Sequence, residues 1–217
     1  PKVRIVGKMS DLLSLETFID LKACLHGSQV RAAGTADAFR YVGKGLATWL
    51  ENLLDELGVK DKPVIKGQVH PGAYVLGRVL IDEGAVVEPT AYIQGPCYIG
   101  PGTEVRHGAY IRGNVYVGKD AVVGHATEVK GSMFFDEAKA GHFAYVGDSI
   151  LGRDVNLGAG TKLANLALSR QTIRVKHPTS GALISSGLTK FSAIMGDGAQ
   201  TRSEEHTSEL QSHSFIS

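Results

Sequence analysis

Three residues that could bind an anion or move a proton stand at regular intervals in the second half of the chain. Lys130 stands eighteen positions after Arg112, and His142 stands twelve positions after Lys130. An Arg guanidinium can hold a phosphate with a fork of two hydrogen bonds, and a Lys ammonium adds a point charge. If the fold brings Arg112 and Lys130 together, they can clamp a dianion such as a phosphate. The alternative is that both cations point into solvent, which costs little.

His142 lies in the segment AGHFAYVGD. Acyl transfer to an amine needs a base that accepts the proton of the attacking nitrogen, and histidine suits this task near neutral pH. A single histidine can equally be structural. The residue types alone leave both roles open.

The elements that would position these residues follow from a six-residue repeat. From Val69 to Val129 every sixth residue is Val or Ile, and the residue four positions after each of the first ten is small or β-branched. Neither the helical period of 3.6 nor the strand period of 2 predicts two registers fixed at six over such a length. A hexapeptide repeat is typical of a parallel β-helix.

Three hexads make one triangular coil, with the Val or Ile inside and the small residue near a corner. Strands of successive coils pair in parallel, about 4.8 Å apart, and each coil buries the aliphatic side chains of the next. Residues separated by three hexads then become neighbours, which places Lys130 over Arg112. Chance alternation in a β-sandwich could mimic a few hexads, but eleven positions in register favour the β-helix.

His107 and His125 are also separated by three hexads. A zinc site like that of the γ-class carbonic anhydrases, which use the same type of β-helix, would need a pair of histidines four residues apart. The sequence contains no such pair. A ladder of neutral histidines facing solvent is therefore the favoured interpretation, and no metal is predicted.

Composition sets further limits. The 217 residues include 23 basic and 22 acidic side chains, for a net charge of +1, which gives no argument for a nucleic-acid partner. The 27 glycines suit a solenoid rich in turns. Cys24 and Cys97 form no disulfide framework. No apolar run approaches the length of a membrane span and no secretory signal is visible, so a cytoplasmic protein is expected.

A helical segment is expected over residues 1–62. It should contain a short helix near residues 14–24 and a longer one that Thr35 caps and Gly58 ends. Gly43 and Gly45 would weaken the middle of that helix by about 1 kcal/mol each. Its apolar stripe is expected to pack against the first coil; the stripe comprises Phe39, Val42, Leu46, Trp49, Leu50, Leu53, Leu54 and Leu57.

The β-helix is expected over residues 63–201. Its strict phase is lost after Val129, and later inward positions include five-residue intervals, which we interpret as a local insertion or bulge that could re-aim side chains. These positions are Ala140, Val146, Leu151, Leu157 and Leu163. Residues 167–189 are predicted to form an inserted loop. Residues 202–217 include RSEEHTSELQS, which resembles a translated sequencing adapter, so a non-native tail without a role is predicted.

The run from Arg112 to Gly160 resembles the acetyltransferase domain of the bifunctional UDP-N-acetylglucosamine pyrophosphorylase/glucosamine-1-phosphate N-acetyltransferase family. The matching motifs are IRG, EVK, KAGHFAYVGD and DVNLGAGT, followed after the insertion by LTKFSAIMGD. The resemblance covers roughly residues 64–166 and 188–200. It implies a left-handed parallel β-helix, a homotrimer with sites between chains, and acetyl-CoA as the acyl donor.

The resemblance also implies the site residues. It makes His142 the general base and places Ala159 at acetyl-CoA. It assigns substrate binding to Arg112, Glu128, Lys130, Tyr145, Asn156, Asn165 and Lys190. Backbone N–H groups near Gly158–Gly160 are expected to form an oxyanion hole. Two features depart from the family: Leu166 replaces a Tyr, and the 167–189 insertion replaces a few residues.

The expected function is acetyl-CoA-dependent N-acetylation of an amino-sugar phosphate, glucosamine 1-phosphate in particular, in UDP-N-acetylglucosamine-type synthesis. No nucleic acid or membrane partner is expected. One alternative is a non-catalytic trimerising or regulatory β-helix module of a sugar-phosphate nucleotidyltransferase. The other is metal catalysis of the γ-carbonic-anhydrase type, which the histidine spacing disfavours.

Overall fold

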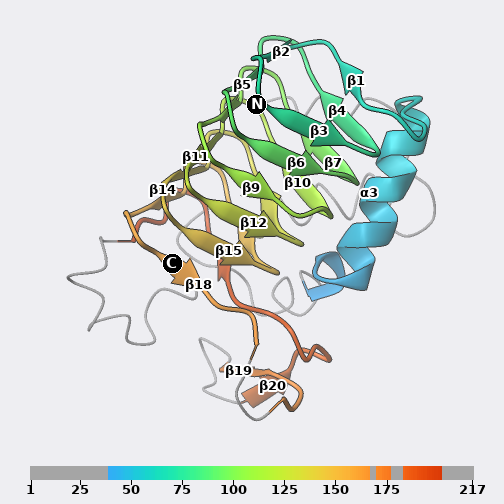
Figure 1. Cartoon of the computed structure of the whole chain (residues 1–217). Coiled ribbons are helices and arrows are strands. Elements are labelled where there is room, and N and C mark those ends of the chain that lie inside the picture. The colour runs from blue at the N-terminus through green and yellow to red at the C-terminus, as the bar shows by residue number, and fades with distance from the viewer. Residues whose placement is uncertain (1–38, 167–169, 177–182, 202–217) are drawn as a thin grey trace.

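The structure is a computed structural model, which describes residues 39–166, 170–176 and 183–201. The helix predicted near residues 14–24, the Thr35 cap and the predicted tail at 202–217 lie outside the described residues. Within the described residues, three parallel sheets form the three faces of a prism (Figure 1). The parallel β-helix predicted from the hexads is confirmed.

Within the regular coils every third strand belongs to the same face, so one coil contributes one strand to each sheet. Face A contains β1 (Val64–Ile65), β4 (Val79–Ile81), β7 (Cys97–Ile99), β10 (Val115–Val117), β13 (Met133–Phe134), β16 (Ile150–Leu151) and β21 (Ile194–Met195). Face B contains β2 (Gln68–Val69), β5 (Val86–Val87), β8 (Glu104–Val105), β11 (Val122–His125), β14 (Lys139–His142) and β17 (Asn156–Leu157). Face C contains β3 (Tyr74–Leu76), β6 (Tyr92–Gln94), β9 (Tyr110–Ile111), β12 (Glu128–Lys130), β15 (Tyr145–Gly147) and β18 (Lys162–Leu163).

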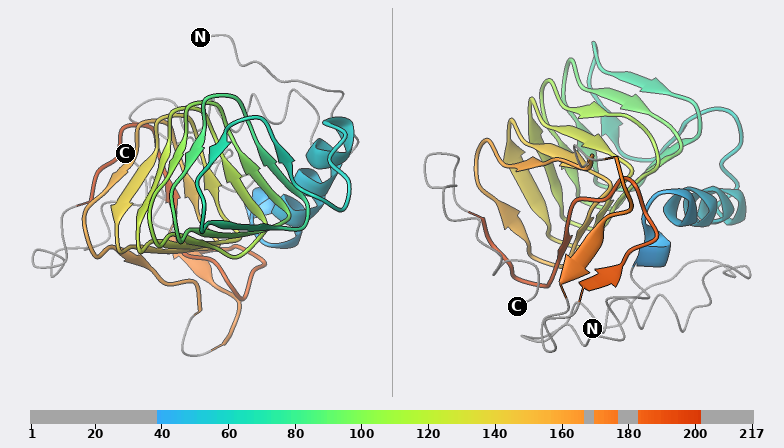
Figure 2. Two further views of the ribbon diagram at one scale, coloured as in Figure 1. Left: turned by 45° about the horizontal axis from the view of Figure 1, so that its top comes forward. Right: turned by 90° about the horizontal axis from the view of Figure 1, so that it is seen from below.

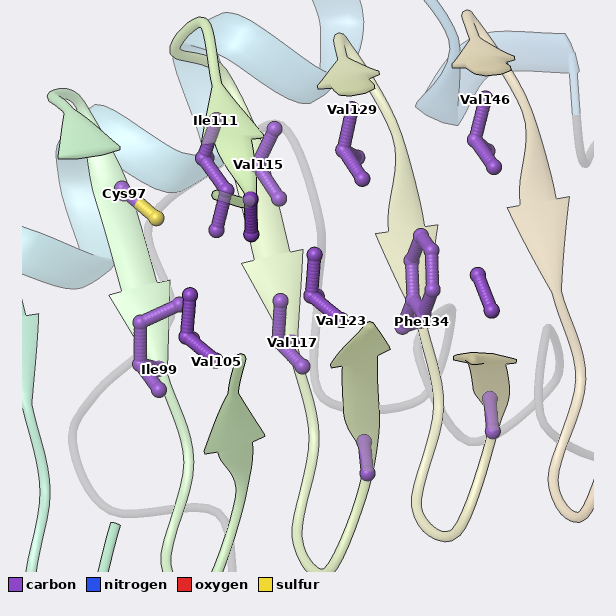
Figure 3. Packing of buried hydrophobic residues seen from close by; sticks show 14 of the residues in the cluster. Cys97, Ile99, Val105, Ile111, Val115, Val117, Val123, Val129, Phe134 and Val146 are labelled. Atoms are coloured by element: carbon purple, nitrogen blue, oxygen red, sulfur yellow. The ribbon is translucent and has the colours of Figure 1, made fainter. Parts of the chain in front are cut away.

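The aliphatic ladder fills the interior of the prism. Ile99, Val105 and Ile111 are fully buried, and each faces the equivalent residue of the next coil (Figure 3). At the corners, small side chains leave room for the backbone to turn, and buried hydroxyls satisfy backbone groups. The Thr103 hydroxyl, for example, donates to the Gly118 oxygen at 2.6 Å and accepts from the Ala121 N–H at 3.2 Å.

The loss of phase after Val129 is a shortening of the same corner in two successive coils, because Val129 pairs with Val146 and Val146 pairs with Leu163, each seventeen positions on. Ile111 pairs with Val129, three full hexads on, whereas Val129 pairs with Val146, which is one position short of three hexads. The predicted insertion or bulge is therefore wrong, because the coil loses one residue at the corner between faces C and A. Ser132 fills this corner: its buried hydroxyl donates to the Lys130 oxygen at 2.9 Å and accepts from the Ser149 N–H at 3.1 Å.

The helix α3 (Lys44–Glu56) lies against the outer surface of face A (Figure 1). It begins after Gly43, whose φ of 65° ends the preceding 3-10 turn η1 (Phe39–Tyr41). The prediction that Gly43 lies inside a longer helix is wrong, since a glycine in the left-handed region starts a helix here instead of weakening one.

The apolar side of α3 packs against several coils and not only against the first coil, where its packing was expected. Trp49 meets Tyr116 edge to face with ring centroids 5.2 Å apart. The same cluster includes Leu80, Met133 and Ile150, which are outward residues of three different coils of face A. Arg78 connects the helix to the turn between β3 and β4 by ion pairs with Glu51 and, at 2.6 Å, with Asp55.

Within the predicted 167–189 insertion, β19 (Arg174–Lys176) and β20 (Leu183–Ser185) pair in an antiparallel hairpin. The hairpin lies at the end of the prism, near η1 (Figure 2). Ile173, Val175 and Leu188 pack against the cluster that holds α3. The insertion thus extends the outer packing layer of face A, and it leaves the prism directly after Asn165 and Leu166.

Candidate functional site

Two ion pairs cross face C at the coils of β12 and β15. Arg112, directly after β9, donates through Nη1 to Glu128 Oε1 at 2.6 Å, and its guanidinium lies 5.8 Å from the centre of the Tyr110 ring. The hydrogen bond to Glu128 raises the pKa of Arg112, so the side chain stays charged. One coil on, Lys130 Nζ donates to Asp148 Oδ2 at 3.3 Å. The Arg112 N–H donates to the Val129 oxygen at 2.9 Å, which places Arg112 and Lys130 on neighbouring coils, as the hexad repeat predicted.

A chain of hydrogen bonds continues from Lys130 to the edge of the insertion. Asp148 also accepts from Asn165 Nδ2, and Asn165 Oδ1 accepts from the Tyr145 hydroxyl at 3.4 Å. Burial, followed by the nearby carboxylates of Glu128 and Asp148, raises the pKa of Tyr145. The Tyr145 hydroxyl therefore remains a proton donor at neutral pH.

Five of the predicted substrate residues come together in this way: Arg112, Glu128, Lys130, Tyr145 and Asn165 lie in one polar patch on face C. Asp148 joins them, although no role was predicted for it. The sequence contained a signal for Asp148, since this residue ends the VGD motif just before a shortened corner. Only the structure shows that its carboxylate turns toward Lys130 and Asn165.

His142 ends β14 on face B, three residues before Tyr145 begins β15 on face C. His142 is exposed, and its Cα pairs with that of His125 one coil below. The His142 oxygen accepts from the Gly160 N–H at 3.3 Å, so the GAG segment with Ala159 runs beside it on the next coil. The predicted base and the predicted acetyl-CoA residue therefore share the corner next to the polar patch.

The predicted oxyanion hole is not formed by the two glycines of this segment. The Gly160 N–H donates to the His142 oxygen, and the Gly158 N–H donates to Thr201 Oγ1 at 2.9 Å. These donors hold the corner together. Because both already have an acceptor within the chain, neither is left to stabilise an oxyanion.

Two predicted residues stand apart from the patch. Asn156 begins β17 on face B, exposed, with Lys139 and Gln200 as its strand neighbours. Lys190 is exposed and pairs through its backbone with Leu166, while the next residue, Phe191, donates its N–H to the Asn165 oxygen at 2.9 Å. The insertion thus returns beside the patch, with Lys190 at its rim.

His107 and His125 form a stack, with ring centroids 5.2 Å apart and an angle of 5° between the rings. Their Nδ1 atoms lie 3.2 and 2.8 Å from the backbone oxygens of Pro89 and His107. Among the described residues, no group of three or more His, Cys, Asp or Glu side chains could hold a metal ion. In the same part of the chain, no helix is long and apolar enough to cross a membrane.

Comparison with known proteins gives a family for this fold. The family described as GMPPB C-terminal domain matches residues 93–204, about half of the chain. A "Bifunctional protein GlmU" from Methanococcus maripaludis is 49% identical over 137 residues, which is 63% of this chain and 33% of that protein. A second, from Methanocaldococcus jannaschii, is 34% identical over 149 residues, or 69% of this chain and 35% of that protein.

A further relative is a "Bifunctional sugar-1-phosphate nucleotidylyltransferase/acetyltransferase" from Sulfurisphaera tokodaii, 39% identical over 69 residues, or 32% of this chain and 17% of that protein. The chain thus spans about a third or less of the length of the curated relatives it matches. The chain belongs to the GMPPB C-terminal domain family, and it is a hexapeptide-repeat β-helix related to the acetyltransferase region of bifunctional GlmU-type proteins.

Proposed function

We propose that the chain is an acetyl-CoA-dependent N-acetyltransferase that acts on an amino-sugar phosphate, with glucosamine 1-phosphate as the acceptor. The observation that carries the proposal is the polar patch of Arg112, Glu128, Lys130, Tyr145 and Asn165 beside His142. Two cations suit a phosphate, and carboxylate, phenol and amide groups suit the hydroxyl and amino groups of a sugar. Asn156 and Lys190 would contact the acceptor from the neighbouring face and the rim.

In the proposed reaction, His142 takes a proton from the ammonium of the bound sugar. The free amine attacks the thioester carbonyl of acetyl-CoA, and a new N–C bond forms. The nitrogen of the tetrahedral intermediate gives up a second proton, and the intermediate collapses with cleavage of the C–S bond. Of the two protons lost by the nitrogen, one protonates the leaving CoA thiolate and the other passes to solvent. Ala159, a small residue beside His142, would leave space for the acetyl group.

The working unit in this proposal is a homotrimer, with sites formed between chains. The polar patch lies on the open surface of face C, while α3 covers face A. A neighbouring chain would close the patch and supply the oxyanion donors that Gly158 and Gly160 do not.

A thiol-release assay with acetyl-CoA and glucosamine 1-phosphate tests the proposal, using the full-length protein. We expect release of one thiol per acetylated sugar. The change His142→Ala should lower kcat by about a hundredfold or more, because the amine then lacks its base.

The matched control is His107→Ala, which removes a histidine of the same ladder two coils away. Its kcat should stay within about twofold of the wild type. Absence of thiol release from the wild-type protein, or an active His142→Ala variant, would overturn the proposal.

A second candidate is a non-catalytic, trimerising module of a sugar-phosphate nucleotidyltransferase. Two observations favour it: Arg112 and Lys130 each already have an acidic partner within the chain, and Leu166 replaces an expected aromatic contact. Under this alternative the wild-type protein assembles normally but releases no thiol, and His142→Ala changes nothing that can be measured.

A further inference from the structure

Asp148 is a buried carboxylate that joins two parts of the polar patch. Its residue surface is only 4% exposed, and it accepts from Lys130 on β12 and from Asn165 beyond β18. These two partners belong to different coils and lie far apart in the sequence. An ionised carboxylate only accepts hydrogen bonds, so both partners present N–H groups to it.

The backbone fixes Asp148 from several sides. Its N–H donates to the Lys130 oxygen at 2.9 Å, and its own oxygen accepts from the Ser192 N–H at 3.2 Å. Its φ of 44° lies in the left-handed region, which Asp and Asn tolerate better than most residues. Facing it, Gly131 has a φ of 58°, which favours glycine, and a Cβ there would stand 2.5 Å from Asp148 Oδ1. The carboxylate is therefore held in one place.

The direction of the whole hydrogen-bond chain follows from this carboxylate. Because Asp148 only accepts, Asn165 must turn Nδ2 toward it, which leaves Asn165 Oδ1 to face Tyr145. The Tyr145 hydroxyl must then donate to that oxygen. The charge of Asp148 also offsets that of Lys130, so the ammonium keeps a fixed position close to the surface.

We propose, on the basis of the proposed function, that Asp148 is a positioning residue for the acceptor. It holds Lys130, Asn165 and Tyr145 in a single donor and acceptor pattern that matches an amino-sugar phosphate. It makes no contact with the reacting atoms. Without Asp148, the patch keeps its cations but loses its fixed order of hydrogen-bond donors and acceptors. It can then still attract an anion, but it no longer orients a sugar.

The change Asp148→Asn tests this role, since it keeps the size of the side chain and the left-handed turn. The new amide can present either its oxygen or its nitrogen, and Asn165 is then free to turn over. The control is Asp154→Asn, another Asp with positive φ (54°), which is exposed and lies outside the patch. Binding of glucosamine 1-phosphate and of inorganic phosphate is measured for each protein by titration without acetyl-CoA.

We expect Asp148→Asn to weaken glucosamine 1-phosphate binding by about tenfold. Its affinity for inorganic phosphate should not fall, because both cations remain and one repelling carboxylate is gone. Asp154→Asn should bind both ligands as the wild type does. In a double-mutant cycle, Asp148→Asn should add little to Asn165→Ala, since both remove the same network.

Unchanged sugar-phosphate binding in Asp148→Asn, or an equal loss for both ligands, would overturn the positioning role. The second result would indicate general damage to the patch. Binding of glucosamine 1-phosphate by a wild-type protein that releases no thiol would contradict the proposed acetyl transfer. In that case the binding comparison still decides the role of Asp148.

Discussion

Arg112 shows how a surface cation is prepared for a ligand. Its guanidinium is shared between Glu128, at 2.6 Å, and the ring of Tyr110. The side chains of Arg112 and Glu128 are 42% and 34% exposed, so the ion pair contributes little to folding. A phosphate that displaced Glu128 would meet a guanidinium already held in position, which reduces the entropy lost on binding.

The change Arg112→Gln tests this at the residue scale. We expect the KM for glucosamine 1-phosphate to rise about tenfold or more, because a charged hydrogen bond to the phosphate is lost. The free energy of unfolding should change by less than about 1 kcal/mol. Steady-state kinetics and urea denaturation measure the two effects.

Arg106→Gln is the matched control for Arg112→Gln. Arg106 also pairs with a carboxylate on the prism surface, Glu104, at 2.7 Å, but on another face. Its KM should equal that of the wild type. Equal effects of the two changes would contradict a phosphate clamp at Arg112.

At the scale of the coil, small residues decide whether neighbouring coils can approach. Gly124 and Gly141 follow Val123 and Ala140, which pair between β11 and β14. A Cβ built on Gly124 would overlap the Gly141 backbone, including its oxygen. A Cβ on Gly141 would meet no atom within 4 Å. Similar positions on adjacent coils therefore differ sharply in the space around them.

We accordingly expect Gly124→Ala to lower the free energy of unfolding by about 1–3 kcal/mol, because the backbone of the next coil has to move. Gly141→Ala should change the free energy by less than about 0.5 kcal/mol. Urea titrations of the two variants measure the difference. Equal destabilisation would show that glycine flexibility, and not the contact between coils, governs this corner.

For the molecule as a whole, the outer layer on face A connects distant coils. Trp49 and its neighbours on α3 contact residues of several coils, and the β19–β20 hairpin packs against the same cluster. A solenoid with contacts only between neighbouring repeats can unfold in parts. A helix that spans the repeats should make them unfold together.

Cys97 reports on the interior of the prism, and Trp49 reports on the outer layer that α3 forms on face A. Cys97 is fully buried inside the prism, and burial raises the pKa of its thiol well above the usual range, so it should react with a thiol reagent only after the coils open. Trp49 is the single tryptophan of the chain, so its fluorescence follows α3. In a Cys24→Ser variant, we expect the two signals to change at the same urea concentration.

A Cys24→Ser/Cys97→Ser variant gives the background of the labelling reaction. Loss of the Trp49 signal at lower urea, while Cys97 remains protected, would show that α3 unfolds independently. The helix would then be an attachment to face A without a part in holding the coils together.

The six-residue repeat was sufficient to predict the prism. The Val and Ile hexads predicted the parallel coils and their inward residues, because a strict period of six needs no long-range information. The same period, counted over three hexads, was enough to place Lys130 beside Arg112. The family resemblance of the motifs around His142 and Tyr145 identified most residues of the polar patch in advance.

The remaining features depend on contacts between distant parts of the folded chain. The five-residue intervals do not say whether a corner is shortened or bulged. Strand pairings such as Val129 with Val146 and Val146 with Leu163 show that two coils are one position short. Sequence spacing alone does not show that Asn156 lies outside the polar patch. Asn156 begins a strand of face B, whereas Tyr145 begins a strand of face C. The partners of Asp148 are side chains that lie far apart in the chain. Local periodicity fixes a repeat, whereas a corner or a buried carboxylate is fixed by what packs against it.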